Sequence, residues 1–170
     1  MFPGDITIAI NAGQAVQIGK IKFLDALDFV GVEGYFRLDA AADSSAASLR
    51  AAWAPIVEQL RELHVATGKD IMFTEVGYQS RANSYVFPAS TNASVPEDDS
   101  CTSLGVDTDE QANANEALLS SLYAERWFLG VNWWLWRADP TAGGDIDDSF
   151  TPQGKPATLR VLRDWYEWYK

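Results

Sequence analysis

The sequence predicts an α/β fold in which four strand–helix units build one parallel sheet. Short apolar runs of strand length alternate with longer segments whose apolar residues recur at helical spacing. This order favours parallel strands joined by right-handed crossovers. No glycine-rich phosphate-binding sequence follows the first strand, and polar residues collect where each strand ends. Because barrels carry their chemistry at the carboxyl ends of the strands, these observations favour four units of a (β/α)₈ barrel over a doubly wound sheet.

The composition narrows the classes of partner. The 170 residues are 47% hydrophobic and 22% charged, as expected for one globular domain spanning residues 1–170. The net charge of −11 disfavours nucleic acid and anionic membrane surfaces, because both require clustered Lys and Arg side chains. A neutral partner suits this charge better. Seven Trp and six Tyr residues are many for this length, and besides packing in a core they can form flat platforms for sugar rings.

The sequence gives little support for a metal site or a membrane-spanning segment. The single cysteine, Cys101, excludes an intrachain disulfide, and the single histidine, His64, lies in a helical pattern where a structural role is expected. We therefore predict no metal site and no cofactor. No apolar run reaches 18 residues, so we predict no membrane span. No signal peptide precedes the first strand, and an extracellular and a cytoplasmic location both stay open.

The first two strands are short and apolar. Residues 6–11 form a β-branched run that is typical of a strand buried on both faces. A short helical pattern over residues 16–27 follows. Residues 28–36 form the second strand, and because side chains alternate along a strand, Glu33 and Tyr35 share one of its faces.

The third unit places a carboxylate at a strand end. Residues 48–66 carry one apolar stripe at helical spacing, in which Pro55 is expected to restart or kink the helix. Gly68 suits a left-handed C-terminal cap. The strand within residues 70–78 follows and ends at Glu75. A charged side chain at the mouth of a buried strand costs free energy unless it has partners or a task, so Glu75 is the first candidate for a functional residue.

The last unit follows a long polar segment over about residues 79–109. Loops of this length inside a compact domain are often functional. Residues 107–129 show a helical pattern with acids in the first turn, and residues 130–136 form the fourth strand. A loop over residues 137–154 leads to a final helix over residues 156–169, which opens on a proline as helices often do.

Six short stretches resemble one family of sugar-cleaving enzymes. The first, Phe73-Thr74-Glu75-Val76-Gly77-Tyr78, resembles the strand that carries the nucleophile in retaining glycoside hydrolases with a (β/α)₈ barrel. The others agree with it in order and spacing, and they are Leu27–Phe36, Trp53–Pro55, Gln111–Ala112, Trp133–Trp136 and Thr151–Ala157. The chain most resembles glycoside hydrolase family 113, whose known members are β-mannanases. The resemblance spans essentially the whole chain but only strands five to eight, so it implies the C-terminal half of the barrel.

The resemblance also implies roles for individual residues. Glu75 occupies the position of the nucleophile on strand seven. Tyr35 matches an aromatic residue near that carboxylate and is placed to hydrogen-bond it. Trp136 matches the tryptophan that floors the sugar beside the scissile bond, and Trp134 points to the same side of the strand. The further substrate-binding candidates are Tyr78 and Asn11 at the rim, and Glu33, where the family often has an Asp or a small residue and whose role stays open.

One catalytic group of this chemistry is missing from the sequence. Retaining hydrolysis needs an acid/base carboxyl group about 5–5.5 Å from the nucleophile. In enzymes of this clan it is a Glu, usually after an Asn, at the end of strand four. Asn115-Glu116 has this dipeptide but lies inside a helical pattern, where we expect it to face solvent. The resemblance therefore implies that the acid/base lies outside this chain.

Two functions stay open at this point. In the first, the chain is the C-terminal half of a retaining hydrolase that cleaves a β-linked polysaccharide, β-1,4-mannan by resemblance. In the second, it is a non-catalytic half-barrel that binds carbohydrate or associates with itself. An open half-barrel leaves two sheet edges and an apolar face exposed, so both readings predict a partner, either an N-terminal half-barrel or a second copy. We therefore expect that the isolated chain does not elute as a compact monomer.

Overall fold

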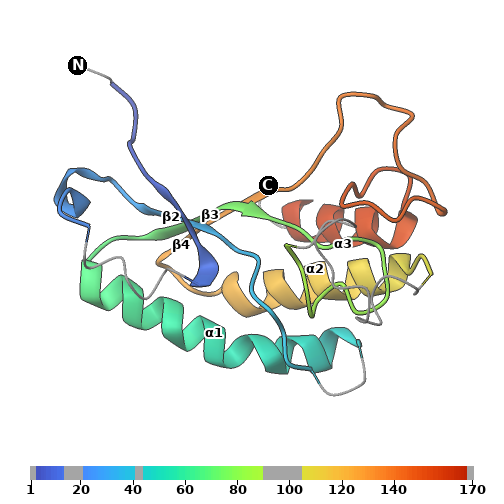
Figure 1. Cartoon of the computed structure of the whole chain (residues 1–170), viewed down its shortest axis with the longest axis horizontal. Coiled ribbons are helices and arrows are strands. Elements are labelled where there is room, and N and C mark those ends of the chain that lie inside the picture. The colour runs from blue at the N-terminus through green and yellow to red at the C-terminus, as the bar shows by residue number, and fades with distance from the viewer. Residues whose placement is uncertain (1–2, 14–20, 41–43, 90–104, 168–170) are drawn as a thin grey trace.

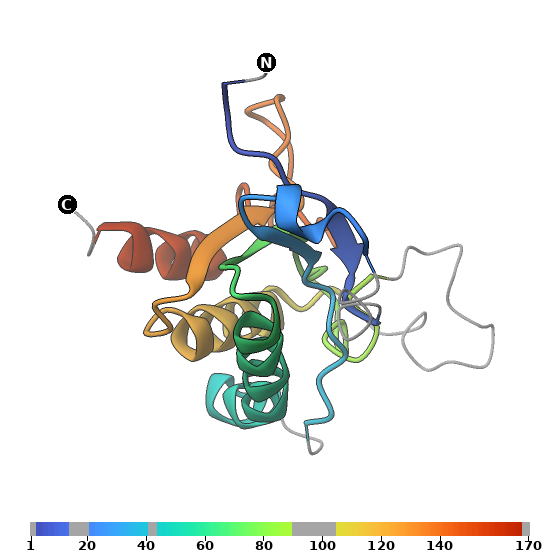
Figure 2. The same cartoon turned by 90° about the vertical axis from the view of Figure 1, so that its left-hand side faces the viewer.

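The structure is a computed structural model that describes residues 3–13, 21–40, 44–89 and 105–167. Four strands pair in parallel and in chain order, namely β1 (Ala9–Asn11), β2 (Val30–Glu33), β3 (Ile71–Val76) and β4 (Phe128–Trp133). The α-helices of the described part lie on the same side of this sheet (Figures 1 and 2), and they are α1 (Ala46–Thr67), α2 (Thr108–Leu122) and α3 (Pro156–Glu167). A doubly wound sheet would contain a point where the strand order reverses. The described strands follow the order β1-β2-β3-β4 without such a reversal. The predicted half of a (β/α)₈ barrel is confirmed.

Helix α1 begins and ends where the sequence predicts. The Ser45 side chain accepts a hydrogen bond from the backbone N–H of Ser48, which caps the first turn. Gly68 ends the helix with a φ of 65°, which glycine adopts without steric cost. The expected restart at Pro55 is wrong, because α1 continues through it. Pro55 and Ala51 are both exposed, so water can solvate the carbonyl that loses its helical donor.

An aromatic cluster joins α1 to the sheet. The Phe73 ring of β3 stacks on Trp53 at 6.2 Å between centroids and meets Phe128 of β4 edge-on at 4.9 Å. Gly34 makes room for this cluster, because a Cβ there would lie 2.6 Å from the Phe73 ring. His64 stacks on Trp127 at 5.9 Å and its Nδ1 lies 2.9 Å from the Lys69 carbonyl oxygen. These contacts give His64 the structural role that its sequence context predicts.

The first two strands are shorter than the predicted residues 6–11 and 28–36, and two predicted helices differ more. The helix expected over residues 16–27 lies partly outside the described residues, and its described part contains only the 3₁₀ turn Leu24–Ala26. None of the residues of that turn is fully buried, and only Leu24 packs, partly buried, against the core, so little tertiary packing stabilises a longer helix here. The helix expected over residues 107–129 ends at Leu122, and β4 starts at Phe128 rather than at residue 130. Trp127 and Phe128 prolong the apolar spacing of α2 in sequence but enter the core beside α1 and β3.

Several apolar side chains in or within three residues of the strands β1 and β4 are exposed. They are Ile6, Leu129, Trp134 and Trp136, with exposed fractions between 45% and 58%. β1 and β4 are the two edges of the sheet. Edges and apolar surface of this kind are where a further unit of a barrel would pair and pack.

Candidate active site

Three polar side chains form a row across the carboxyl ends of β1, β2 and β3. The strand register aligns Asn11 with Glu33, and Glu33 with Glu75. Each of these residues comes from a different βα unit, so the row exists only because the three strands pair in this register. The row lies at the carboxyl ends of the strands, where the sequence predicts the functional residues. It brings Asn11, Glu33 and Glu75 together.

A β-bulge brings Glu75 into this row. Val32 is aligned with Phe73, but the next residue, Glu33, is aligned with Glu75, so Thr74 is an extra residue in β3. The pairing with β4 skips one residue in the same place. Ile71 and Phe73 are buried while both Thr74 and Glu75 are half-buried, so the strict alternation of a flat strand is broken here. Bulges near active sites commonly redirect a side chain in this way.

Tyr35 lies directly beside Glu75. Its hydroxyl donates a hydrogen bond to Glu75 Oε2 at 3.4 Å, as the sequence predicts. Burial raises the pKa of the Tyr35 phenol above its usual value, and the charges of Glu75 and Glu33 raise it further. The phenol therefore stays protonated at neutral pH and acts as a donor to the carboxylate.

Phe150, from the loop between β4 and α3, supports Tyr35 from behind. The two rings meet edge-on with centroids 6.4 Å apart. Phe150 also covers Gly77, where a Cβ would lie 3.3 Å from its ring. The same Cβ would lie 1.9 Å from the backbone oxygen of Trp134. The absence of a side chain at Gly77 thus lets the chain after β4 pass close to the strand end that carries Glu75.

The tryptophans after β4 lie on the accessible side of the sheet. Trp134 is 45% exposed and Trp136 is 58% exposed, whereas Trp133 is half-buried and donates through Nε1 to the Tyr166 hydroxyl at 2.9 Å. The backbone N–H of Trp134 donates to the Val76 carbonyl at 2.7 Å. Trp134 is therefore tied to the residue that follows Glu75, while Trp136 lies two residues further along the loop.

Tyr78 does not lie at the rim where the sequence analysis places it. Its side chain is only 1% exposed and belongs to the hydrophobic core. Burial raises the pKa of its phenol. A residue enclosed in this way cannot touch a substrate at the strand ends, so the prediction of Tyr78 as a binding residue is wrong. β3 ends at Val76, so strand alternation does not determine the direction of the Tyr78 side chain.

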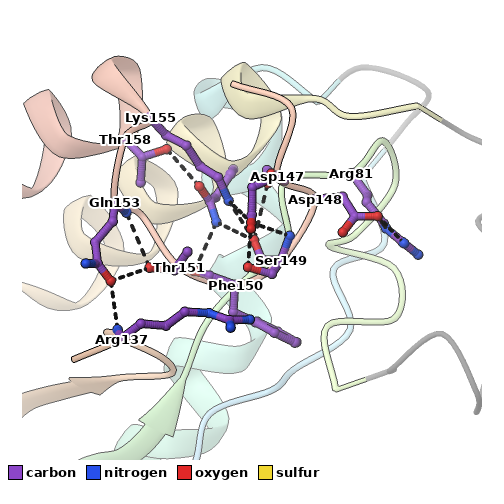
Figure 3. Close-up of polar contacts among 12 residues, drawn as sticks. Arg81, Arg137, Asp147, Asp148, Ser149, Phe150, Thr151, Gln153, Lys155 and Thr158 are labelled. Carbon is purple, nitrogen blue, oxygen red and sulfur yellow. Dashed lines mark hydrogen bonds and ion pairs between the residues drawn. The ribbon is translucent and has the colours of Figure 1, made fainter. Parts of the chain in front are cut away.

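A buried polar clamp joins the loops after β3 and β4 (Figure 3). Gln111 of α2 donates to the Tyr78 carbonyl at 2.8 Å and to the Phe150 carbonyl at 3.1 Å. Thr158 of α3 donates to the Gln111 side-chain oxygen at 3.0 Å. One amide side chain therefore holds both loops and α3 together, and it fixes the backbone of Phe150 behind Tyr35.

A buried ion pair completes this clamp (Figure 3). Lys155 is fully buried, and its Nζ lies 3.2 Å from Asp147 Oδ1 and 2.8 Å from the Ser149 carbonyl. Burial lowers the pKa of Lys155, and Asp147 opposes that effect. Burial acts to raise the pKa of Asp147, but hydrogen bonds from Ser149 and Lys155 outweigh it and hold that pKa below its usual value. The Ser80 hydroxyl donates to the Asp147 carbonyl at 2.6 Å, and Arg81 pairs with Asp148.

Gln153 fixes the start of the same loop. Its Oε1 accepts the backbone N–H of Arg137 at 2.7 Å and the Thr151 hydroxyl at 2.9 Å. Its Nε2 donates to the Asp139 carbonyl at 3.0 Å. These bonds hold the backbone directly after Trp136, so the exposed indole is carried on an ordered segment.

Asn115 and Glu116 lie in α2, away from the strand ends. Asn115 is buried and Glu116 is half-buried, so the expectation that the dipeptide faces solvent is wrong for Asn115. Glu116 accepts a hydrogen bond from the Trp165 indole at 2.8 Å. Neither residue is placed to serve as the acid/base beside Glu75.

Two further absences apply to the described part of the chain. In residues 3–13, 21–40, 44–89 and 105–167, no group of three or more His, Cys, Asp or Glu side chains is placed to bind a metal ion. None of the described helices is long and apolar enough to cross a membrane.

Sequence reasoning missed Phe150, Gln153 and Lys155 as parts of the site. All three lie in a loop, where no periodic pattern indicates which side chains face inward. The resemblance did include residues 151–157, but without a role. The fully buried lysine is recognisable only once the loop is folded, because Lys is otherwise a surface residue.

Comparisons with known proteins agree with the half-barrel fold. The sequence profile of glycoside hydrolase family 113 matches residues 1–155. A β-mannanase of that family from Alicyclobacillus acidocaldarius, solved in complex with ManMIm, is similar at a TM-score of 0.73 and 28% identity. A β-1,4-mannanase of the family is similar at a TM-score of 0.73 and 21% identity. A β-glucuronidase from Ruminococcus gnavus, at a TM-score of 0.57 and 13% identity over 96% of this chain and 26% of its own, shares the fold alone. No curated protein matches the chain.

The coverage of these matches shows how much of each solved relative this chain corresponds to. Each mannanase comparison covers 98% of this chain but only 46% of the solved chain. The chain therefore spans about half the length of the mannanases it resembles, in agreement with its four βα units. The profile matches far more than half of the residues. This chain belongs to glycoside hydrolase family 113.

Proposed function

We propose that the chain is the C-terminal half of a retaining glycoside hydrolase and that Glu75 is its nucleophile. The observation that carries the proposal is the contact between Tyr35 and Glu75 within the row at the carboxyl ends of the strands. The hydrogen bond from the phenol holds the Glu75 carboxylate in position. An ionised carboxylate is the form that attacks an anomeric carbon.

The remaining parts of the reaction divide between this chain and another half-barrel. Trp134 and Trp136 are accessible and can stack on the apolar faces of sugar rings. Asn11 and Glu33 lie in the row with Glu75 and can hydrogen-bond sugar hydroxyls. The acid/base that protonates the leaving oxygen is supplied from outside this chain, about 5–5.5 Å from Glu75.

We infer that the substrate is a β-1,4-linked mannan. The support for this choice is that two of the most similar solved structures are mannanases, one of them at 28% identity. A neutral polysaccharide also suits the net charge of −11. An acidic polysaccharide would be repelled by that charge.

We infer that the partner is the complementary N-terminal half-barrel. The exposed apolar residues and the two open edges are surfaces that such a unit would cover. A second copy of this chain is the alternative occupant, and it would supply no acid/base at the position that the chemistry needs. Size-exclusion chromatography with light scattering distinguishes a monomer, a dimer and a complex.

The test of the nucleophile uses a mannosyl fluoride whose 2-hydroxyl is replaced by fluorine. Fluoride leaves without a general acid, so the trapped glycosyl-enzyme can form when only the nucleophile is present. We expect a mass adduct on the peptide that contains Glu75, with the chain alone or extended by any coding sequence upstream of Met1. Glu75→Gln should abolish the adduct, and Glu62→Gln on the exposed face of α1 should not. An adduct that persists in Glu75→Gln would sink the assignment.

A carbohydrate-binding half-barrel without catalysis is the second candidate. The exposed tryptophans favour it independently of Glu75. Binding of mannohexaose without adduct formation or hydrolysis, in every form of the protein, would select this function. Binding lost in Trp136→Ala but kept in Glu75→Gln would locate it in the same cleft.

A further inference from the structure

A groove on the outer wall of the half-barrel has no role in the proposed reaction. Its lining residues belong to α2, to α3 and to Tyr123 at the end of α2. These two helices contact each other and lie on the helical side of the sheet (Figures 1 and 2). A hollow of about 450 Å³ is lined by Glu116, Tyr123, Asp164 and Trp165. A second hollow, of about 460 Å³, shares Glu116 and Asp164 with the first. We call the two together the α2–α3 groove, and each is of the size that small-molecule sites occupy.

One end of the α2–α3 groove is aromatic. The rings of Tyr123 and Trp165 pack against each other, with centroids 4.8 Å apart and planes inclined at 59°, and both line the first hollow. The Trp165 indole N–H donates to Glu116 Oε2 at 2.8 Å, which fixes the ring and leaves the other oxygen of Glu116 as an acceptor. Inclined aromatic walls flanked by a few polar groups are typical of ligand sites.

The other end of the groove is polar and carries both signs of charge. Its lining adds Asp109, Asn113 and Arg160 to the two shared carboxylates. Three carboxylates against one guanidinium disfavour an anionic ligand, and no three acidic side chains of the described residues are placed to hold a metal ion. Together these groups offer hydrogen-bond donors and acceptors in close succession.

We propose that the α2–α3 groove binds a neutral oligosaccharide chain at a site separate from Glu75. A ligand that is rich in hydroxyl groups and has apolar ring faces matches both ends of the groove, because sugar rings stack on aromatic walls and their hydroxyls bond to mixed polar groups. The groove is elongated, as the two hollows share residues. A site of this kind holds a polysaccharide on the wall of the barrel and does not depend on Glu75 being a nucleophile.

The test is affinity electrophoresis of the 170-residue chain in native gels that contain soluble galactomannan. The cleft is first disabled with Trp134→Ala and Trp136→Ala, so that the remaining retardation reports the groove. We expect the galactomannan to retard this background, and Trp165→Ala to weaken its apparent affinity about tenfold, because aromatic side chains dominate the energetics of binding interfaces. Val65→Ala, at an exposed apolar position of α1, is the matched control and should leave retardation unchanged.

A second variant guards against misfolding. Trp165 is half-buried, so its removal can disturb the packing of α3. Asp164→Ala removes an exposed carboxylate whose contact in the structure is with the neighbouring Arg163, and it should weaken retardation while the circular dichroism spectrum stays unchanged. Equal retardation of Asp164→Ala and the background, or no retardation of the background at all, overturns the proposal. If no glycosyl adduct forms at Glu75 but the background variant is still retarded, only the assignment of Glu75 as the nucleophile is overturned.

Discussion

The Tyr35 hydroxyl donates to Glu75 across two neighbouring strands, and Phe150 packs edge-on against the Tyr35 ring from a third segment. The carboxylate is therefore positioned by residues that lie 40 and 75 positions away in the sequence. Each part of this chain of contacts can be changed separately, because Tyr35, Phe150 and the clamp around Gln111 touch different partners.

Removing the phenolic hydroxyl tests the first contact. If the proposed mannan hydrolysis is found, Tyr35→Phe should lower its kcat about 10- to 100-fold, because a hydrogen bond to a charged group is lost. KM should change little if the contact acts on the nucleophile rather than on substrate binding. Tyr166→Phe, on the exposed surface of α3, is the control. An unchanged kcat in Tyr35→Phe would show that the contact does not serve catalysis.

Removing the ring behind Tyr35 tests the second contact. Phe150→Ala should raise the rate at which N-acetylimidazole modifies Tyr35 at least about fivefold, because burial no longer protects the phenol. Peptide mapping by mass spectrometry reads each tyrosine separately, and the buried Tyr85 should react as slowly as before. Faster modification of Tyr85 as well would indicate general unfolding and contradict a local effect.

The close approach at Gly77 makes a sharp test of the chain path. Gly77→Ala should destabilise the fold by about 1–3 kcal/mol or more, because its Cβ would overlap the backbone oxygen of Trp134. Gly105→Ala is matched to it, since a Cβ there meets nothing within 4 Å. Urea unfolding followed by tryptophan fluorescence measures both. Equal stability of the two variants would mean that the loop after β4 does not pack on Gly77.

The buried lysine should be costly to remove. Lys155→Met leaves the Asp147 carboxylate and the Ser149 carbonyl without their ammonium partner. Breaking a buried pair from one side costs about 3 kcal/mol. Because Asp147 keeps some access to water, Lys155→Met/Asp147→Asn should recover part of this loss. A double variant that is less stable than the single one would contradict the pairing.

The lowered pKa of Asp147 predicts how stability depends on pH. Its folded-state pKa lies below the unfolded value, so the unfolded chain binds more protons and stability rises with pH in this region. The contribution is therefore complete above the unfolded pKa of about 3.9 and is lost as pH falls through the folded pKa. The stability difference between the wild type and Asp147→Asn should be present at pH 6 and should shrink below about pH 4. A constant difference down to pH 2 would exclude this carboxylate as its source.

More of the fold than of the candidate site could be predicted from the sequence. Strand runs, one amphipathic α1 and the absence of a phosphate-binding loop were enough for a parallel sheet of barrel type, because periodicity reports which face is buried. The end of α2 was misplaced since Trp127 and Phe128 satisfy both the helical stripe and the strand core. Only the tertiary contacts decide between these two environments.

Within the site, the residues that the sequence identifies lie on strands or within three residues of a strand end. Glu33, Tyr35 and Glu75 follow from strand position and resemblance, and the register places them together. Tyr78 was misplaced because the chain leaves β3 after Val76 and turns its ring into the core. Loop residues such as Phe150 and Lys155 depend on contacts between segments that no local pattern records.

The extra residue in β3 reverses the parity of the strand. Ile71, Phe73 and Glu75 are spaced two residues apart, so a regular strand would turn all three side chains to the same face. Ile71 and Phe73 are buried, and Phe73 packs on Trp53 of α1. Without the bulge at Thr74, Glu75 would therefore face the helices as well. A single inserted residue thus lets one strand supply core side chains at its start and a carboxylate beside Tyr35 at its end.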